Sequence, residues 1–171
     1  MSEKPSDTST PPDAPTLLLD ENLSDEDIAI FLRRLHKHWR IEVHADHFKK
    51  GETDVEVIRG CAEHDWVLIS VDDRIRYVPE NKAAALRYKL RAFMFNKGNY
   101  QGVEYAAALI VGRSEIARTL QKFSGPFFAR IRISGDVNML EPQEPVGGLT
   151  SREKTERKYG KKIEGESGSQ E

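Results

Sequence analysis

Two short apolar runs that end in acidic residues constrain the fold of this chain more than any other feature. The first is TLLLDE at 16–21, and the second is WVLISVDD at 66–73. Apolar runs of this length are typical of strands that are buried on both faces of a parallel sheet. The pattern therefore predicts two buried strands, each of which places carboxylates directly after its last residue.

Composition divides the 171-residue chain into one foldable segment and two polar ends. Residues 1–15 and 141–171 are rich in Pro, Ser, Glu, Lys and Gly and have few apolar residues to bury. We predict that both are disordered tails. Residues 16–140 then form a single domain of ordinary size.

The sequence also predicts a cytoplasmic location. Its N-terminus has no apolar segment of the kind found in secretory signals, and its longest apolar run, 106–111, is too short to span a bilayer. Cys61 is the single cysteine, so no intrachain disulfide can form. We place Cys61 on the buried face of a helix, as a small core residue.

Periodicity, caps and turn residues predict alternating strands and helices. One helix begins after Ser24, because acidic residues fill its first turn, and another begins after Thr53, whose capping box Glu56 completes. Pro79 opens a third helix, after an irregular segment at 74–78. Further strands are predicted at 39–44, 90–95 and 127–133, and further helices at 103–111 and 114–123.

This order of elements predicts an α/β fold with a mostly parallel sheet and helices on both sides. The last strand, 127–133, alternates apolar residues with arginines, which is typical of a strand with one solvent-exposed face. We therefore expect it at an edge of the sheet.

The predicted topology brings acidic residues together. Ligands of parallel sheets bind beyond the carboxyl ends of the strands, where Asp20, Asp72 and Asp73 are expected. Asp54 and Glu56 begin a helix that opens on the same edge. Carboxylates in such a cluster repel one another unless a cation neutralises them, and oxygen ligands favour Mg²⁺ or Mn²⁺. Such ions activate water and stabilise in-line displacement at a phosphodiester.

Each acidic residue also has a structural interpretation. Asp54 suits the positive end of a helix dipole, Glu56 suits a capping box, and Glu21 and Asp73 can point away from their neighbours. Asp20 and Asp72 have few structural duties, so they are the strongest candidates. A zinc site built from the histidines is disfavoured by their spacing, and we expect them at the surface, exposed or half-buried: His36, His38, His44, His47 and His64.

Charge is distributed unevenly along the chain. Residues 16–73 hold 7 Lys and Arg against 14 Asp and Glu, a net charge of −7, whereas residues 74–140 hold 12 against 4, a net charge of +8. Juxtaposing the two halves could hold a metal ion on one side and a polyanion on the other. The alternative is that both sets of charges are ordinary solvated surface.

Three segments together resemble the PIN-like domains, in particular the VapC-type toxin ribonucleases that open on DENL. They are LLLDENLS at 17–24, TDVEVI at 53–58 and WVLISVDDRIRYVPE at 66–80. The resemblance extends from residue 16 to about 133. It implies a PIN-like three-layer sandwich and a Mg²⁺-dependent (or Mn²⁺-dependent) endoribonuclease, the toxin of a type II toxin–antitoxin pair with a cognate small antitoxin. A homodimer is compatible with it.

The resemblance also assigns roles to individual residues. The family's acids correspond to Asp20 after the first strand, Asp54 at the helix start and Asp72 after the later strand. Many relatives carry another acid two residues further on, where this chain has Arg74. Asp73 could substitute for it, so the predicted catalytic residues are Asp20, Asp54, Asp72 and Asp73, and Glu21 is a further predicted metal ligand.

The basic half then has a use in RNA binding. Arg74 and Arg76 lie nearest the acids in the sequence, and Arg87 and Arg91 follow in the next helix and strand. All four could contact phosphates, although plain surface charge is the favoured interpretation of Arg87 and Arg91. The predicted RNA-binding residues are Arg74, Arg76 and Arg87. Two other functions stay open: a non-catalytic RNA-binding PIN-like module that lost a metal ligand at Arg74, and a receiver-type phospho-acceptor domain with an acidic pair after its first strand.

Overall fold

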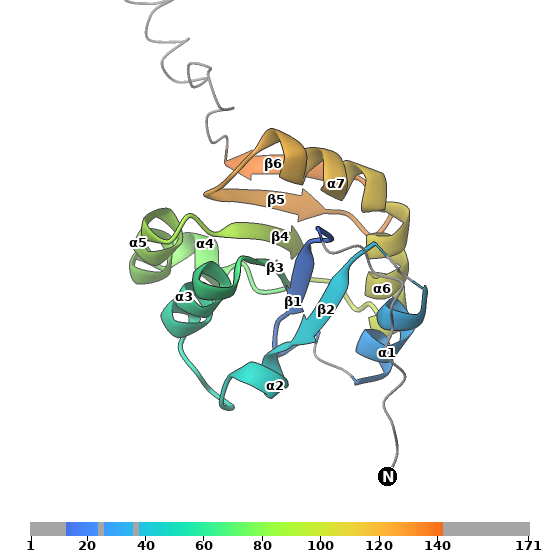
Figure 1. Ribbon diagram of the computed structural model, residues 1–171, viewed down its shortest axis with the longest axis horizontal. Helices are drawn as coiled ribbons and strands as arrows, with labels where there is room; N and C mark the ends of the chain where they lie inside the picture. Colours follow the sequence, from blue (N-terminus) through green and yellow to red (C-terminus); the bar gives the residue numbers. More distant parts are fainter. Residues whose placement is uncertain (1–12, 24–25, 36–37, 142–171) are drawn as a thin grey trace, which may run out of the picture.

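Strands and helices alternate along the part of the chain that the computed structural model describes, which is residues 13–23, 26–35 and 38–141 (Figure 1). In chain order they are β1 (Thr16–Leu19), α1 (Glu26–Leu35), β2 (Arg40–Val43), α2 (His44–His47), α3 (Asp54–His64), β3 (Trp66–Ser70), α4 (Arg74–Tyr77), α5 (Pro79–Arg87), β4 (Arg91–Phe95), α6 (Gly102–Val111), α7 (Arg113–Lys122), β5 (Phe127–Ile131) and β6 (Val137–Glu141).

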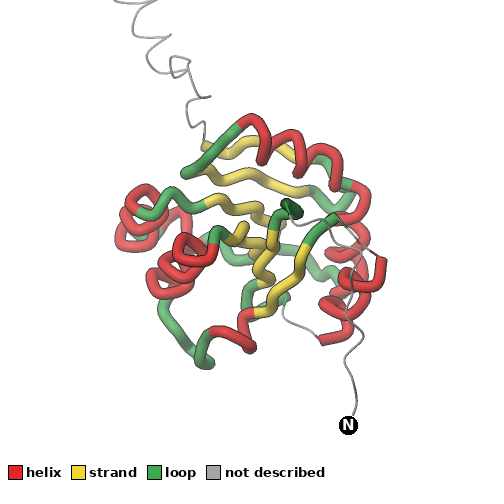
Figure 2. The backbone as a smooth tube through the Cα atoms, viewed as in Figure 1, coloured by secondary structure: helices red, strands yellow, loops and turns green. Residues whose placement is uncertain are grey.

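One six-stranded sheet organises these elements (Figure 2). The strand order is β2-β1-β3-β4-β5-β6; the first five strands are parallel and β6 runs antiparallel to β5. The chain moves outward from β1 to β2 and then crosses back to β3 on the other side of β1. The strand order therefore reverses between β1 and β3, and such a switch point is where open α/β sheets bind ligands.

Helices cover both faces of the sheet, as predicted. Leu17 and Leu19 belong to one buried cluster, together with residues of α1, α6 and α7. Leu18 belongs to a second cluster, with residues of α3, α4 and α5. All three leucines are fully buried because successive side chains of a strand point to opposite faces, and both faces are covered. The mostly parallel α/β sandwich inferred from the sequence is confirmed.

Local capping places α3 where the sequence predicted it. Thr53 Oγ1 accepts a hydrogen bond from the Glu56 backbone N–H at 3.3 Å, and Asp65 ends the helix in a left-handed conformation with φ 56°. The Glu56 carboxylate pairs with Arg59, whereas the reciprocal capping box lies at α6, between Gln101 and Glu104. The start of α3 faces the carboxyl ends of β1 and β3.

The prediction of an edge strand at 127–133 is wrong. β5 lies between β4 and β6, and four of its five residues are buried. The sequence reading missed β6, which returns through a tight turn in which Gly135 adopts φ 90° and its N–H donates to the Arg132 carbonyl at 2.8 Å. The segment after β3, predicted as irregular, contains the short helix α4.

Some predictions lie outside the described residues. These are the disorder of residues 1–12 and 142–171, the cap at Ser24 and the exposure of His36. In the described segments, helices long and apolar enough to cross a bilayer are absent.

Candidate functional site

Asp20 and Asp72 meet at the carboxyl ends of two adjacent strands. β1 and β3 pair in parallel with Leu19 opposite Ile69, and the Asp20 N–H extends the ladder by donating to the Ile69 carbonyl at 3.0 Å. Ser70 joins the two acids: its hydroxyl donates to Asp20 Oδ2 and accepts from the Asp72 N–H at 3.0 Å. The expected meeting of these acids at one rim of the sheet is what the structure shows.

A cavity of about 200 Å³ lies between these strand ends and the start of α3. Four of the predicted site acids line it: Asp20 and Glu21 directly after β1, Asp54 in the first turn of α3, and Asp72 shortly after β3. Asp73 is not among the lining residues. The cavity therefore gathers acids that are up to 52 residues apart in the sequence, from Asp20 to Asp72.

Asp20 is buried and held by backbone donors. Its Oδ1 accepts from the N–H groups of Asn22, at 2.9 Å, and Leu23, at 3.2 Å. Burial raises the pKa of Asp20 above its ordinary value, although the hydrogen bonds from Ser70 and these amides oppose the increase. A cation in the cavity would favour the ionised form that burial disfavours.

Asp72 is paired with the residue two positions after it. Its Oδ1 accepts from the Arg74 N–H at 2.9 Å, and its Oδ2 accepts from Arg74 Nε at 2.7 Å. Partial burial acts to raise the pKa of Asp72, but the hydrogen bonds and charge of Arg74, with the charge of Lys97, together hold that pKa below its ordinary value. The Arg74 side chain is 73% exposed, so it can leave Asp72 without unpacking the core.

Asp54 reaches the cavity from the first turn of α3. Its Oδ2 accepts from Asn81 Nδ2 on α5 at 2.6 Å, and Asn81 is buried. The neutral amide orients Asp54 and leaves its charge uncompensated by this contact. Asp54 therefore has a tertiary partner in addition to its place at the positive end of the helix dipole.

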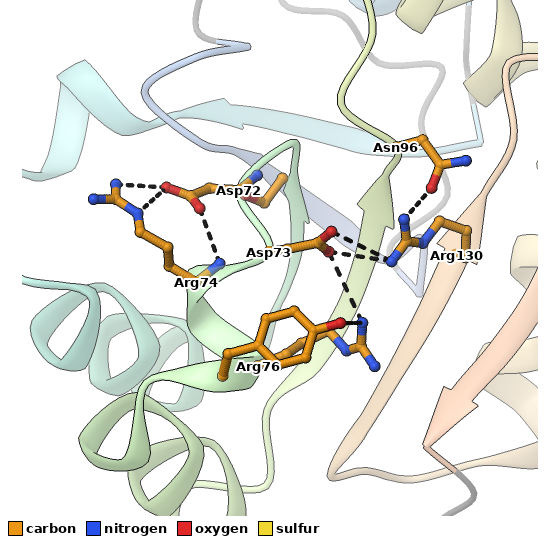
Figure 3. A network of polar contacts seen from close by, with 8 residues as sticks. Asp72, Asp73, Arg74, Arg76, Asn96 and Arg130 are labelled. Atoms are coloured by element: carbon orange, nitrogen blue, oxygen red, sulfur yellow. Dashed lines mark hydrogen bonds and ion pairs between the residues drawn. The ribbon is translucent and has the colours of Figure 1, made fainter.

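Asp73 belongs to a different network, on the side of β4 and β5 (Figure 3). Its Oδ1 accepts from Arg130 Nη2 at 3.2 Å, and Arg76 Nη1 lies 4.0 Å from the same oxygen. Arg130 also donates to Asn96 Oδ1. Adjacent residues after a strand thus face opposite ways, with Asp72 toward the cavity and Asp73 toward two arginines.

The predicted RNA-binding arginines are dispersed. Arg74 and Arg76 lie at the carboxyl edge of the sheet, on α4. Arg87 ends α5, so it lies about 12 Å along the helix axis from Pro79, the end nearer the cavity. Arg91 begins β4 and so lies at the amino ends of the strands, away from the cavity, where its Nη2 pairs with Asp65 Oδ1 at 2.7 Å.

The residues around the cavity fit a divalent ion in their chemistry. Asp20, Asp54 and Asp72 supply the oxygen donors that Mg²⁺ and Mn²⁺ prefer. Among the described residues, however, no three Asp, Glu, His or Cys side chains are arranged closely enough to ligate one ion. Arg74 donates hydrogen bonds to both carboxylate oxygens of Asp72. Asp72 could therefore ligate an ion here only after it releases Arg74.

Sequence reasoning missed several residues of the site. Ser70 and Asn81 orient the acids, yet neither belongs to a charge or motif pattern. The expectation that all the histidines lie at the surface, exposed or half-buried, is wrong for His44, which is buried, lines the cavity and contacts the Phe48 ring at a centroid distance of 5.2 Å. Cys61 is a buried core residue as predicted, and burial raises its pKa to about 12.

A comparison with protein-family models matches residues 15–97 to the family described as PIN like domain. The match spans β1 to β4 and so includes Asp20, Asp54 and Asp72. Comparisons with curated proteins and with solved structures gave no match. The family match supports a PIN-like assignment, and PIN-like domains are commonly nucleases or act on RNA.

Proposed function

We propose that this chain, with its PIN-like match over residues 15–97, is a divalent-metal-dependent endoribonuclease. The observation that carries the proposal is the cavity at the strand-order switch point, where Asp20, Asp54 and Asp72 converge. A cluster of acids in one cavity is electrostatically unfavourable without a cation, which supports a metal-binding role over a purely structural one.

Each residue of the cavity has a proposed role. Asp20, fixed by Ser70 and two backbone amides, and Asp72, once released by Arg74, would hold the ion, with Asp54 as a third donor. Glu21 is exposed at the rim and would bind through water. The bound Mg²⁺ or Mn²⁺ would supply activation of water and stabilisation of charge at the phosphodiester. The predicted metal role of Asp73 has no support from the cavity, because Asp73 contacts Arg130.

RNA is the proposed substrate, and the released Arg74 would contact it. An exposed guanidinium beside an acid cluster can exchange a carboxylate for a phosphate, which it binds in the same forked geometry. A single-stranded or looped RNA suits the site, because its backbone can bend toward the ion. Arg87 keeps its predicted role in RNA binding only for a substrate that extends along α5.

Cleavage of RNA by the purified chain tests the proposal. Wild type with Mg²⁺ or Mn²⁺ should cleave an RNA that contains single-stranded loops, and Asp20→Asn and Asp72→Asn should each abolish cleavage while remaining folded. Asn at position 20 can keep the two backbone amide bonds through Oδ1 and donate to Ser70, so the fold should tolerate it. Unchanged cleavage in both variants would eliminate the cavity as the active site.

A non-catalytic RNA-binding module is the second candidate, and the Arg74–Asp72 pair favours it. This pair occupies the acid that the proposed reaction needs. The module predicts salt-sensitive RNA binding without metal-dependent cleavage. Arg74→Asp separates the two functions: if the wild type is inactive and this variant cleaves RNA with Mg²⁺, the module has lost activity through residue 74.

The proposed biological role is that of a cytoplasmic toxin held inactive by a small antitoxin. It predicts that expression of the wild type arrests growth and that expression of Asp72→Asn does not. A small DNA-binding protein encoded next to this chain, which restores growth when co-expressed, would support the role. Arrest by Asp72→Asn to the same extent would contradict it.

A further inference from the structure

We propose that a pocket at the carboxyl ends of β4 and β5 binds an unpaired guanine base of single-stranded RNA. The inference rests on the proposed RNA substrate and adds base selection to it. The pocket has a volume of about 240 Å³, which is below the roughly 300–1,000 Å³ of pockets for drug-sized ligands and suits a single base. It is lined by Phe95, Asn96, Tyr100, Arg132, Ile133 and Ser134.

The pocket lies on the same rim of the sheet as the carboxylate cavity. β3, β4 and β5 are adjacent and parallel, so their carboxyl ends point the same way (Figure 1). Asp72 follows β3 and Asn96 directly follows β4, and neighbouring strands lie about 4.8 Å apart. Against partial burial, Arg74 and Lys97, the residue after Asn96, lower the pKa of Asp72. The loop that begins at Asn96 is therefore close enough to the cavity for their charges to interact.

Tyr100 provides an exposed aromatic ring that its neighbours hold in place. The residue is 39% exposed. Gly98 packs so closely against the ring that a Cβ at position 98 would clash with it. Tyr105 contacts the ring edge-on at a centroid distance of 5.8 Å, and Phe95 contacts Tyr105 at 4.9 Å. An aromatic ring that is fixed in advance can stack an unpaired base at a low cost in conformational entropy.

The polar side chains of the pocket chiefly offer hydrogen-bond donors. Arg132 is exposed, and among the described residues its guanidinium has no ion pair or hydrogen bond. Asn96 Oδ1 accepts from Arg130, whereas the Asn96 amide nitrogen points away from Arg130 and stays available as a donor (Figure 3). Ser134 Oγ already donates to Asp136 Oδ2 at 2.6 Å. A ligand for this pocket therefore needs acceptors beside a flat ring.

Guanine matches this pattern better than the other bases. Its O6 and N7 are adjacent acceptors, and the forked donors of an arginine bind both together. Adenine presents a donor beside N7, and its bidentate recognition by an asparagine requires the Oδ1 atom that Asn96 gives to Arg130. A pyrimidine presents at most one acceptor on the corresponding edge. Arg132 and Tyr100 together therefore favour guanine.

Binding of fluorescent RNA pentamers by the full chain in EDTA tests the inference without metal or cleavage. The probes are UUGUU, UUAUU and UUUUU. Wild type should bind UUGUU about tenfold more tightly than the other two, which is the size of one bidentate arginine–guanine contact. Arg132→Gln should reduce this ratio to within about twofold, and because Arg132 is exposed the variant should fold.

Arg118→Gln is the matched control for the loss of a surface charge. The Arg118 side chain is also exposed, at 69%, but it lies on α7 and does not line the pocket. This variant should change the binding of all three pentamers to the same extent, because phosphate contacts do not distinguish bases. The preference for UUGUU should stay near tenfold.

Two further variants test the aromatic ring. Tyr100→Leu should weaken binding of UUGUU about tenfold, as expected for the loss of one stacked base, whereas Tyr100→Phe should bind like the wild type. Gly98→Ala should also weaken binding although it removes no side chain, because its new methyl group pushes the Tyr100 ring aside.

The possible outcomes separate this inference from the nuclease proposal. Equal binding of UUGUU and UUAUU by the wild type, or a preference for UUGUU that survives in Arg132→Gln, would overturn the inference and leave metal-dependent cleavage untouched. A preference for UUGUU in a protein that cleaves no RNA with Mg²⁺ or Mn²⁺ would instead overturn the nuclease proposal alone.

Discussion

Asp72 and Asp73 are neighbours in the chain but belong to two regions of opposite character. Asp72 lines a cavity with Asp20 and Asp54, where acids outnumber their cationic partners. Asp73 instead contacts Arg130 and lies near Arg76, and Arg130 also donates to Asn96. Because side chains that follow a strand alternate in direction, a pair of acids can serve two sites at once. Sequence proximity to a catalytic position therefore does not imply the same role.

Substitution of each acid by its amide should separate the two regions most strongly. Asp72→Asn should reduce RNA cleavage by at least about 100-fold, because losing even an outer-shell partner of a metal site costs 10–100-fold. Asp73→Asn should keep cleavage at saturating RNA and metal within about tenfold of the wild type, since Asp73 does not line the cavity. Single-turnover cleavage with saturating RNA measures both. Equal losses would place Asp73 in the metal site.

Removal of Arg74 should strengthen metal binding by the acids of the cavity. Arg74→Gln frees Asp72 from an exposed ion pair, and because exposed ion pairs are weak, Mn²⁺ should bind only up to about fivefold more tightly. Calorimetric titration of Mn²⁺ into both proteins measures the difference. Weaker Mn²⁺ binding in the variant would show that Arg74 supports the site instead of competing for it.

The two cavity acids should make opposite contributions to stability as pH changes. Both start from an ordinary value of 3.8. Because the pKa of Asp72 is lower in the folded protein than in the unfolded chain, its ionised carboxylate stabilises the fold above pH 3.8, and this stabilisation is lost as pH falls through the folded-state pKa. Because the pKa of Asp20 is higher in the folded protein, its protonated carboxyl group stabilises the fold at low pH, and this stabilisation is lost as pH rises from 3.8 through the folded-state pKa.

Denaturant unfolding of Asp20→Asn over a series of pH values measures this difference without metal. The free energy of unfolding of the variant, relative to the wild type, should increase as pH rises above 3.8, because the variant has no buried charge to form. Asp72→Asn should show the reverse: the wild type should lose its advantage as pH falls. A pH-independent difference for Asp20→Asn would mean that Asp20 is not buried as described.

The smallest effect is expected far from both regions. Arg91→Gln removes the pair with Asp65, whose side chain is 92% exposed, so the free energy of unfolding should fall by about 1 kcal/mol or less. Thermal unfolding checks this value. A larger loss would show that the amino ends of the strands depend on this pair.

The sequence predicted the parts of the site that depend on local pattern. Apolar runs that end in acids located β1 and β3 together with Asp20 and Asp72, and a cap at Thr53 located Asp54. The side chains that orient them, Ser70 and Asn81, became visible only in the fold, because their roles come from tertiary contacts.

The fold differs from the prediction where segments distant in the sequence determine the position of a strand. β5 looked like an edge strand because Arg130 and Arg132 alternate with apolar residues, yet β6 pairs with it, and Arg130 of β5 contacts Asp73. A single sequence does not show that an arginine contacts a half-buried carboxylate 57 residues away. The network around Asp73 was therefore beyond sequence reasoning, whereas the acidic cavity was not.

The position of a bound ion tests the central claim most directly. Anomalous diffraction from crystals grown with saturating Mn²⁺ should show a peak in the cavity, ligated by Asp20 and Asp72, with Arg74 displaced from Asp72. A map without a peak in this cavity, in which Arg74 still contacts Asp72, would contradict the account.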